Sequence, residues 1–131
     1  MTGGVVKLPT ILLVEDNPHI MKINAQLLSM QGYAVLKAAT AEEARNRLKE
    51  KQADLIVLDV MLPDGGGLEL CRELKTRYPV PVLFLTALGA SRDIVDGFRA
   101  GGDYYLVKPY DLEVLLSKIR ALLPATQKEE G

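Results

Sequence analysis

The stretch Leu55-Ile56-Val57-Leu58-Asp59-Val60-Met61-Leu62-Pro63 decides the fold of this chain. It begins as a continuous apolar run and reaches a carboxylate at Asp59. A strand made of apolar residues has no side to expose to water, so the run predicts a strand buried on both faces. Pro63 shows that this strand cannot continue. In open parallel sheets ligands bind at the carboxyl ends of strands, so Asp59 stands where chemistry is expected.

Strand and helix patterns alternate along the whole chain. Apolar runs predict five strands, at residues 10–14, 33–38, 55–59, 82–85 and 104–107. Each is followed by a helical pattern, at residues 18–31, 41–51, 68–77, 91–100 and 112–123. This alternation predicts an α/β fold, in which helices cover both faces of a five-stranded parallel sheet through right-handed crossovers.

Local signals mark where several helices begin. Asn17 before Pro18 is a typical N-cap followed by proline in the first turn. Thr40 and Glu43 form a capping-box pattern. We expect the fourth and last helices to be capped by Ser91 and Asp111, respectively. The helical pattern places most apolar residues of the first helix on one face, namely Ile20, Ile23, Leu27, Leu28 and Met30.

Length and composition limit the function classes. The 131 residues suffice for one domain, and 16 basic against 17 acidic residues give a net charge of −1. Nothing in this balance indicates a nucleic-acid or membrane surface. The single cysteine, Cys71, excludes an internal disulfide and a thiolate metal cluster. No apolar run approaches the ~20 residues of a membrane span, and we expect a cytoplasmic protein.

The chain divides into three expected segments. Residues 1–9 form a leader of little predicted structure, too short and too polar for a signal peptide. Residues 10–124 form the domain, and Pro124 stops its last helix. Residues 125–131 form a polar tail or a truncated linker.

Polar side chains stand at the ends of four predicted strands. Glu15 and Asp16 follow the first strand, and Asp59 ends the third. Thr86 ends the fourth strand, and Lys108 follows the fifth. These ends share one edge of a parallel sheet, where three carboxylates repel unless a cation neutralises them. An oxygen-only ligand set suits Mg²⁺, and an aspartate beside a cation, a lysine and a hydroxyl suits phosphoryl transfer, with Asp59 as nucleophile.

From about Thr10 to Leu123 the chain resembles the receiver domain of two-component response regulators. The resemblance rests on motifs in a fixed order, each at a strand end: Glu15-Asp16, Asp59 with Met61-Leu62-Pro63, Thr86-Ala87, and Gly101-Gly102-Asp103-Tyr104-Tyr105 leading to Lys108-Pro109. It implies a flavodoxin-like doubly wound sheet with strand order 2-1-3-4-5. It also implies a signalling protein that catalyses only its own phosphorylation and dephosphorylation.

The resemblance further assigns the phosphoacceptor and metal ligands. Asp59 would accept a phosphoryl group from a phosphohistidine of a sensor histidine kinase or phosphotransfer protein. Glu15 and Asp16 would hold Mg²⁺, together with Asp59 and the backbone carbonyl of Met61.

A switch is implied as well. Lys108 and Thr86 would contact the phosphoryl oxygens, and the Lys108-Pro109 peptide bond would be cis. Thr86 and Tyr105 would form the switch pair, with the Tyr105 ring turning inward. The surface of the fourth helix, fifth strand and last helix would then change shape for a downstream effector.

Four positions depart from the family pattern. Glu15 stands where aspartate is frequent, and Tyr104 where an acidic residue is common. Ile94 and Val114 fall where DNA-binding members carry charges that join two receivers, so that charged dimer network is not matched and the oligomeric state stays open.

Other interpretations stay open for the function and for two motifs. The chain could be a receiver-like scaffold that works without phosphorylation, or a small flavodoxin-like enzyme or flavin carrier. The latter lacks a phosphate-cradling loop where Glu15 and Asp16 stand. Glycines 65–67 lack the lysine of a P-loop and are expected to form a flexible loop beside the site. We expect His19 to be an exposed residue of the first helical turn.

Overall fold

Strands and helices alternate along residues 8–123, the part of the chain that the computed structural model describes. The strands are β1 (Thr10–Val14), β2 (Ala34–Ala38), β3 (Leu55–Leu58), β4 (Val82–Thr86) and β5 (Tyr104–Val107). The helices are α1 (Pro18–Met30), α2 (Ala41–Glu50), α3 (Gly67–Arg77), α4 (Ser91–Arg99) and α5 (Leu112–Leu122). The predicted order of elements is confirmed, and Pro124 lies outside the described residues.

The five strands form one parallel sheet in the order β2-β1-β3-β4-β5. This confirms the predicted doubly wound α/β fold and its strand order. In the register, Val14 lies beside Leu58, and Leu58 lies beside Phe84. The carboxyl ends of β1, β3 and β4 therefore meet at one edge of the sheet.

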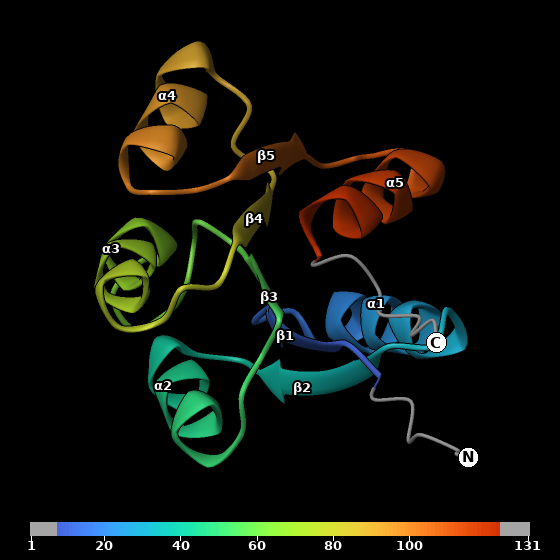
Figure 1. Cartoon of the computed structure of the whole chain (residues 1–131). Helices are drawn as coiled ribbons and strands as arrows, with labels where there is room; N and C mark the ends of the chain where they lie inside the picture. Colours follow the sequence, from blue (N-terminus) through green and yellow to red (C-terminus); the bar gives the residue numbers. More distant parts are fainter. Residues whose placement is uncertain (1–7, 124–131) are drawn as a thin grey trace, which may run out of the picture.

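Two layers of helices cover the sheet. Helices α2, α3 and α4 lie on one face, and α1 and α5 lie on the other (Figure 1). Strand β3 contributes Ile56 and Leu58 to the first core and Leu55 and Val57 to the second. All four side chains are at most 2% exposed, which confirms the prediction of a strand buried on both faces.

Most predicted helix caps are present. The Asn17 carboxamide oxygen accepts hydrogen bonds from the His19 and Ile20 N–H groups, and Asp111 accepts one from Glu113 N–H. Thr40 Oγ1 accepts from Glu43 N–H at 3.0 Å. The prediction for α4 was wrong, because Ser91 is already its first helical residue and no side chain caps it from the preceding position.

The apolar face expected for α1 is only partly buried. Leu28 is buried, together with Asn24 and Ala25. Ile23 and Met30 point to solvent, with 64% and 75% of their surfaces exposed. The prediction that these two share the core face with Leu28 was therefore wrong. Within residues 8–123, no helix is long and apolar enough to cross a membrane.

Candidate functional site

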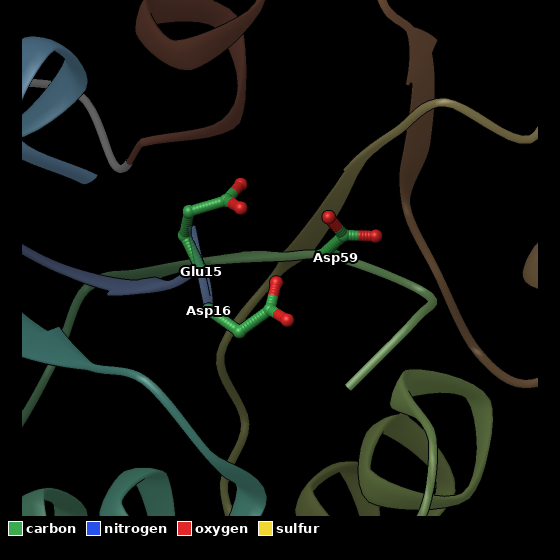
Figure 2. A group of neighbouring side chains, drawn as sticks. All are labelled: Glu15, Asp16 and Asp59. Atoms are coloured by element: carbon green, nitrogen blue, oxygen red, sulfur yellow. The ribbon is translucent and has the colours of Figure 1, made fainter. Parts of the chain in front are cut away.

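Three carboxylates meet where β1 and β3 end. Glu15 and Asp16 directly follow β1, and Asp59 directly follows β3. Because these strands are neighbours, oxygens of all three carboxylates lie within 4.8 Å of one another (Figure 2). Glu15 is 3% exposed and Asp59 is 7% exposed, whereas Asp16 reaches solvent. The predicted cluster therefore forms, with two of its acids buried.

Backbone amides orient both buried carboxylates. The Asn17 N–H donates to Glu15 Oε2 at 3.1 Å. The Met61 N–H donates to Asp59 Oδ1 at 3.0 Å. A charge-assisted bond from a fixed amide restricts the rotation of a carboxylate. One oxygen of each acid is thus held by the loop that follows its strand.

The ammonium group of Lys108 bonds to the other oxygen of each buried acid. Its Nζ lies 2.9 Å from Glu15 Oε1 and 3.2 Å from Asp59 Oδ2. Burial alone would lower the pKa of Lys108, but the hydrogen bond to Glu15 and the charge of Asp59 outweigh it, and the pKa is raised. Lys108 is therefore a charged partner within the cluster. The Lys108-Pro109 peptide bond is cis, as predicted.

Thr86 and Tyr105 lie on neighbouring strands and meet the backbone of the same residue. Thr86 is fully buried, and its Oγ1 accepts a long hydrogen bond of 3.5 Å from the Leu88 N–H. The Tyr105 hydroxyl donates to the Leu88 carbonyl oxygen at 2.7 Å. Burial raises the pKa of Tyr105 to about 12. The Tyr105 ring therefore lies inward, with Leu88 between it and Thr86.

Gly97 of α4 provides the space for this ring, and the sequence analysis had missed it. A Cβ atom at Gly97 would lie 2.6 Å from Cδ2 and 2.8 Å from Cε2 of Tyr105. Carbon atoms in contact normally stay about 3.5–4.0 Å apart. A glycine inside a helical pattern was the available signal, since it costs helix stability unless packing requires it.

The loop after β3 also depends on its glycines. Gly65 and Gly66 have φ angles of +133° and +84°, which only glycine adopts readily. A Cβ at Gly67 would meet the backbone carbonyl oxygen of Asp59. These residues thus follow a defined path beside Asp59.

The donor set of the cluster fits a hard cation. All three side chains offer carboxylate oxygens, and hard divalent cations such as Mg²⁺ prefer oxygen ligands. Solvent reaches the cluster through an open groove of about 420 Å³ lined by residues that include Glu15 and Asp16. The site is therefore accessible to a metal that retains part of its water shell.

The surface of α4, β5 and α5 carries exposed apolar side chains. Val95 and Phe98 of α4 are 46% and 47% exposed, and Val114 of α5 is 39% exposed. Ile94 and Tyr104 are half-buried, and Lys118 Nζ lies 4.6 Å from the centre of the Tyr104 ring. At these departing positions this surface is more apolar than charged.

Comparison with known proteins gives one consistent family. The profile of the response regulator receiver domain matches residues 11–120. The DNA-binding dual master transcriptional regulator RpaA of Synechocystis sp. is 40% identical over 124 residues, which cover 92% of this chain and 52% of RpaA. The response regulator MprA of Mycobacterium sp. (strain KMS) is 42% identical over 122 residues, with shares of 92% and 53%. The chain thus spans about half the length of the curated relatives it matches.

Solved structures agree with this match. A two-component response regulator from Clostridium difficile superposes with a TM-score of 0.85 at 29% identity, covering 87% of this chain and 94% of that one. The BeF3-activated DrrB receiver domain gives a TM-score of 0.82 at 35% identity, with 88% and 97% covered. The Vibrio cholerae chemotaxis protein CheY4 gives 0.83 at 28% identity, with 89% and 100% covered.

Proposed function

Because the chain belongs to the response regulator receiver domain family, we propose that it is a signalling receiver activated by phosphorylation of Asp59. The donor is a phosphohistidine of a sensor kinase or a phosphotransfer protein. A carboxylate oxygen of Asp59 attacks phosphorus, the P–N bond breaks and the histidine nitrogen leaves. One observation carries the proposal: Asp59 shares a cluster within 4.8 Å with Glu15 and Asp16, and Lys108 Nζ lies 3.2 Å from its Oδ2.

Mg²⁺ is the cofactor of this reaction. Glu15, Asp16 and Asp59 would hold it together with the backbone carbonyl of Met61, in agreement with the oxygen-only donor set. When bound, the ion neutralises charge on the transferring phosphoryl group. Lys108 adds a positive charge beside the acceptor, and no separate general base is needed because Asp59 attacks as a carboxylate.

Thr86 and Tyr105 form the switch. The Thr86 hydroxyl makes only a long bond of 3.5 Å with Leu88 N–H, which leaves it able to turn toward a phosphoryl oxygen. Such a turn releases the Leu88 backbone, which also holds the Tyr105 hydroxyl. The modification at Asp59 then changes the surface of α4, β5 and α5, where a downstream effector binds. Ile94 and Val114 argue against a receiver dimer held by a charged network there.

The protein is a signalling phosphoacceptor that catalyses only its own phosphorylation and dephosphorylation. It acts in the cytoplasm, where its kinase domain partner is found. The net charge of −1 supports a domain that does not itself bind nucleic acid, although RpaA is described as a DNA-binding regulator. In a longer regulator, this half would carry the switch and the remainder the output.

Labelling with a small phosphodonor tests the proposal. Incubation with acetyl phosphate and Mg²⁺ is expected to add one phosphoryl group to the wild-type chain, measured by intact-mass spectrometry. Asp59→Asn should stay unlabelled, whereas Glu69→Gln, which removes an exposed acid from α3, should label like wild type. Equal labelling of Asp59→Asn, or full-rate labelling in EDTA, would refute the proposal.

A further inference from the structure

Asp64 caps a helix that lies far from it in the sequence. Its Oδ1 accepts a hydrogen bond of 2.8 Å from Ala41 N–H, 23 residues away, and its Oδ2 accepts one of 3.1 Å from Glu42 N–H. These are the first two N–H groups of α2. The bond from Ala41 is also the main reason why the pKa of Asp64 is lowered. Asp64 is therefore bonded as a carboxylate to the positive end of this helix.

The loop that carries Asp64 begins at Asp59. Near its start, Met61 N–H bonds to Asp59 Oδ1, and at its end Gly67 N–H donates to the Val60 carbonyl oxygen at 2.6 Å. These two bonds close the loop on itself. The two bonds of Asp64 fix it to an element outside the loop, at a point three residues beyond Met61.

Helix α2 is itself a fixed support for the loop. The Arg45 guanidinium forms a two-pronged ion pair with the Glu73 carboxylate of α3, with a shortest distance of 2.9 Å. The α3 helix directly follows the loop in the chain. The loop is thus held between α2, through Asp64, and α3, which Arg45 ties back to α2.

We propose that Asp64 is a positioning residue for the acceptor site: by bonding to α2 it holds the loop so that the Met61 backbone meets Asp59. The inference rests on the proposed function, which counts the Met61 carbonyl among the Mg²⁺ ligands. Loss of this tie loosens Met61, weakens its bond to Asp59 and lowers the affinity for Mg²⁺.

A cap that only stabilises α2 would have different consequences, and Thr40 provides the matched control. Thr40 Oγ1 accepts from Glu43 N–H in the same first turn of α2, yet it does not contact the loop after β3. Removing either cap exposes N–H groups of the same helix end. Only the loss of Asp64 should reach Met61 and the metal.

The experiment compares wild type, Asp64→Ala, Asp64→Asn and Thr40→Ala. Hydrogen exchange of the Met61 amide is measured without metal, and Mg²⁺ affinity is measured by NMR titration. We expect Asp64→Ala to speed the exchange and to weaken Mg²⁺ binding about ten-fold, as removal of a group that orients a ligand does. Asp64→Asn should restore part of both values, since its one oxygen still accepts from Ala41 N–H. Thr40→Ala should lower the melting temperature and leave both values unchanged.

The possible failures can be told apart. Equal changes in Asp64→Ala and Thr40→Ala would overturn the inference, as would an unchanged Met61 amide in Asp64→Ala. A wild-type chain that did not bind Mg²⁺ would instead contradict the proposed function, and the metal-free exchange would still decide the role of Asp64.

Discussion

Lys108 and Asp59 lie 49 positions apart in the sequence, yet Nζ of the lysine is 3.2 Å from Oδ2 of the aspartate. The contact crosses two strand ends, because β4 separates β3 from β5 in the sheet. The same ammonium group binds Glu15 at 2.9 Å. A single cation thus neutralises charge on two buried acids at the position where the proposed phosphoryl group would attach.

Replacement of this lysine should slow the chemistry more than it perturbs the fold. Lys108→Met keeps much of the side-chain volume but removes the charge beside Asp59. We expect labelling by acetyl phosphate to slow about 10²-fold, the usual cost of losing one preorganised donor to a developing charge. The initial rate of phosphoryl incorporation measures this, with Lys118→Met on α5 as the control. A rate within two-fold of wild type in Lys108→Met would contradict the role of Lys108.

Tyr105 makes stability depend on alkaline pH. Its folded-state pKa is raised from 10.0 to about 12, so the unfolded chain loses this proton first as the pH rises. The contribution is intact below pH 10 and is lost between about pH 10 and 12. At pH 11 it amounts to about 1.4 kcal/mol of unfolding free energy.

Urea unfolding at about pH 9 and pH 11 checks this pH dependence. Wild type should lose about 1.4 kcal/mol more than Tyr105→Phe over that interval, because phenylalanine cannot ionise. The remaining tyrosines are common to both chains and cancel in the comparison. Equal losses in both chains would show that the Tyr105 phenol is not buried as described.

Gly97 and Tyr105 should be coupled through the space they share. In the wild-type background Gly97→Ala places a Cβ 2.6 Å from the ring and should cost about 1–3 kcal/mol. In a Tyr105→Ala background the ring is gone, and the same substitution should stabilise α4 by up to about 1 kcal/mol, since alanine favours helix. A double-mutant cycle by urea unfolding measures the coupling. Additive effects would disprove the steric account.

Much of the fold followed from simple patterns in the sequence. The all-apolar run of β3 and the alternation of strands with helices predicted the parallel sheet, and the polar residues at strand ends predicted the cluster. The strand order came only from the family resemblance, because periodicity does not say which strands are neighbours. The side-chain roles proposed for Thr86, Lys108 and Met61 stay predictions.

Other features escaped prediction because they depend on contacts between distant residues. Asp64 caps α2 from 23 positions away, whereas capping patterns in a sequence reveal only local partners. Ile23 and Met30 match a helical apolar pattern but lie on the side of α1 that the sheet leaves exposed. Leu88 binds Thr86 and Tyr105 with its backbone alone, so its side chain gave no signal.

The identity of the phosphorylated residue tests the central claim most directly. After labelling with acetyl phosphate and Mg²⁺, borohydride reduction converts an aspartyl phosphate to homoserine, and peptide mass spectrometry locates the converted residue. We predict homoserine at position 59 alone, in proportion to the phosphoryl group incorporated. Conversion at Asp16 or at another acid, or labelling without conversion at Asp59, would contradict the account.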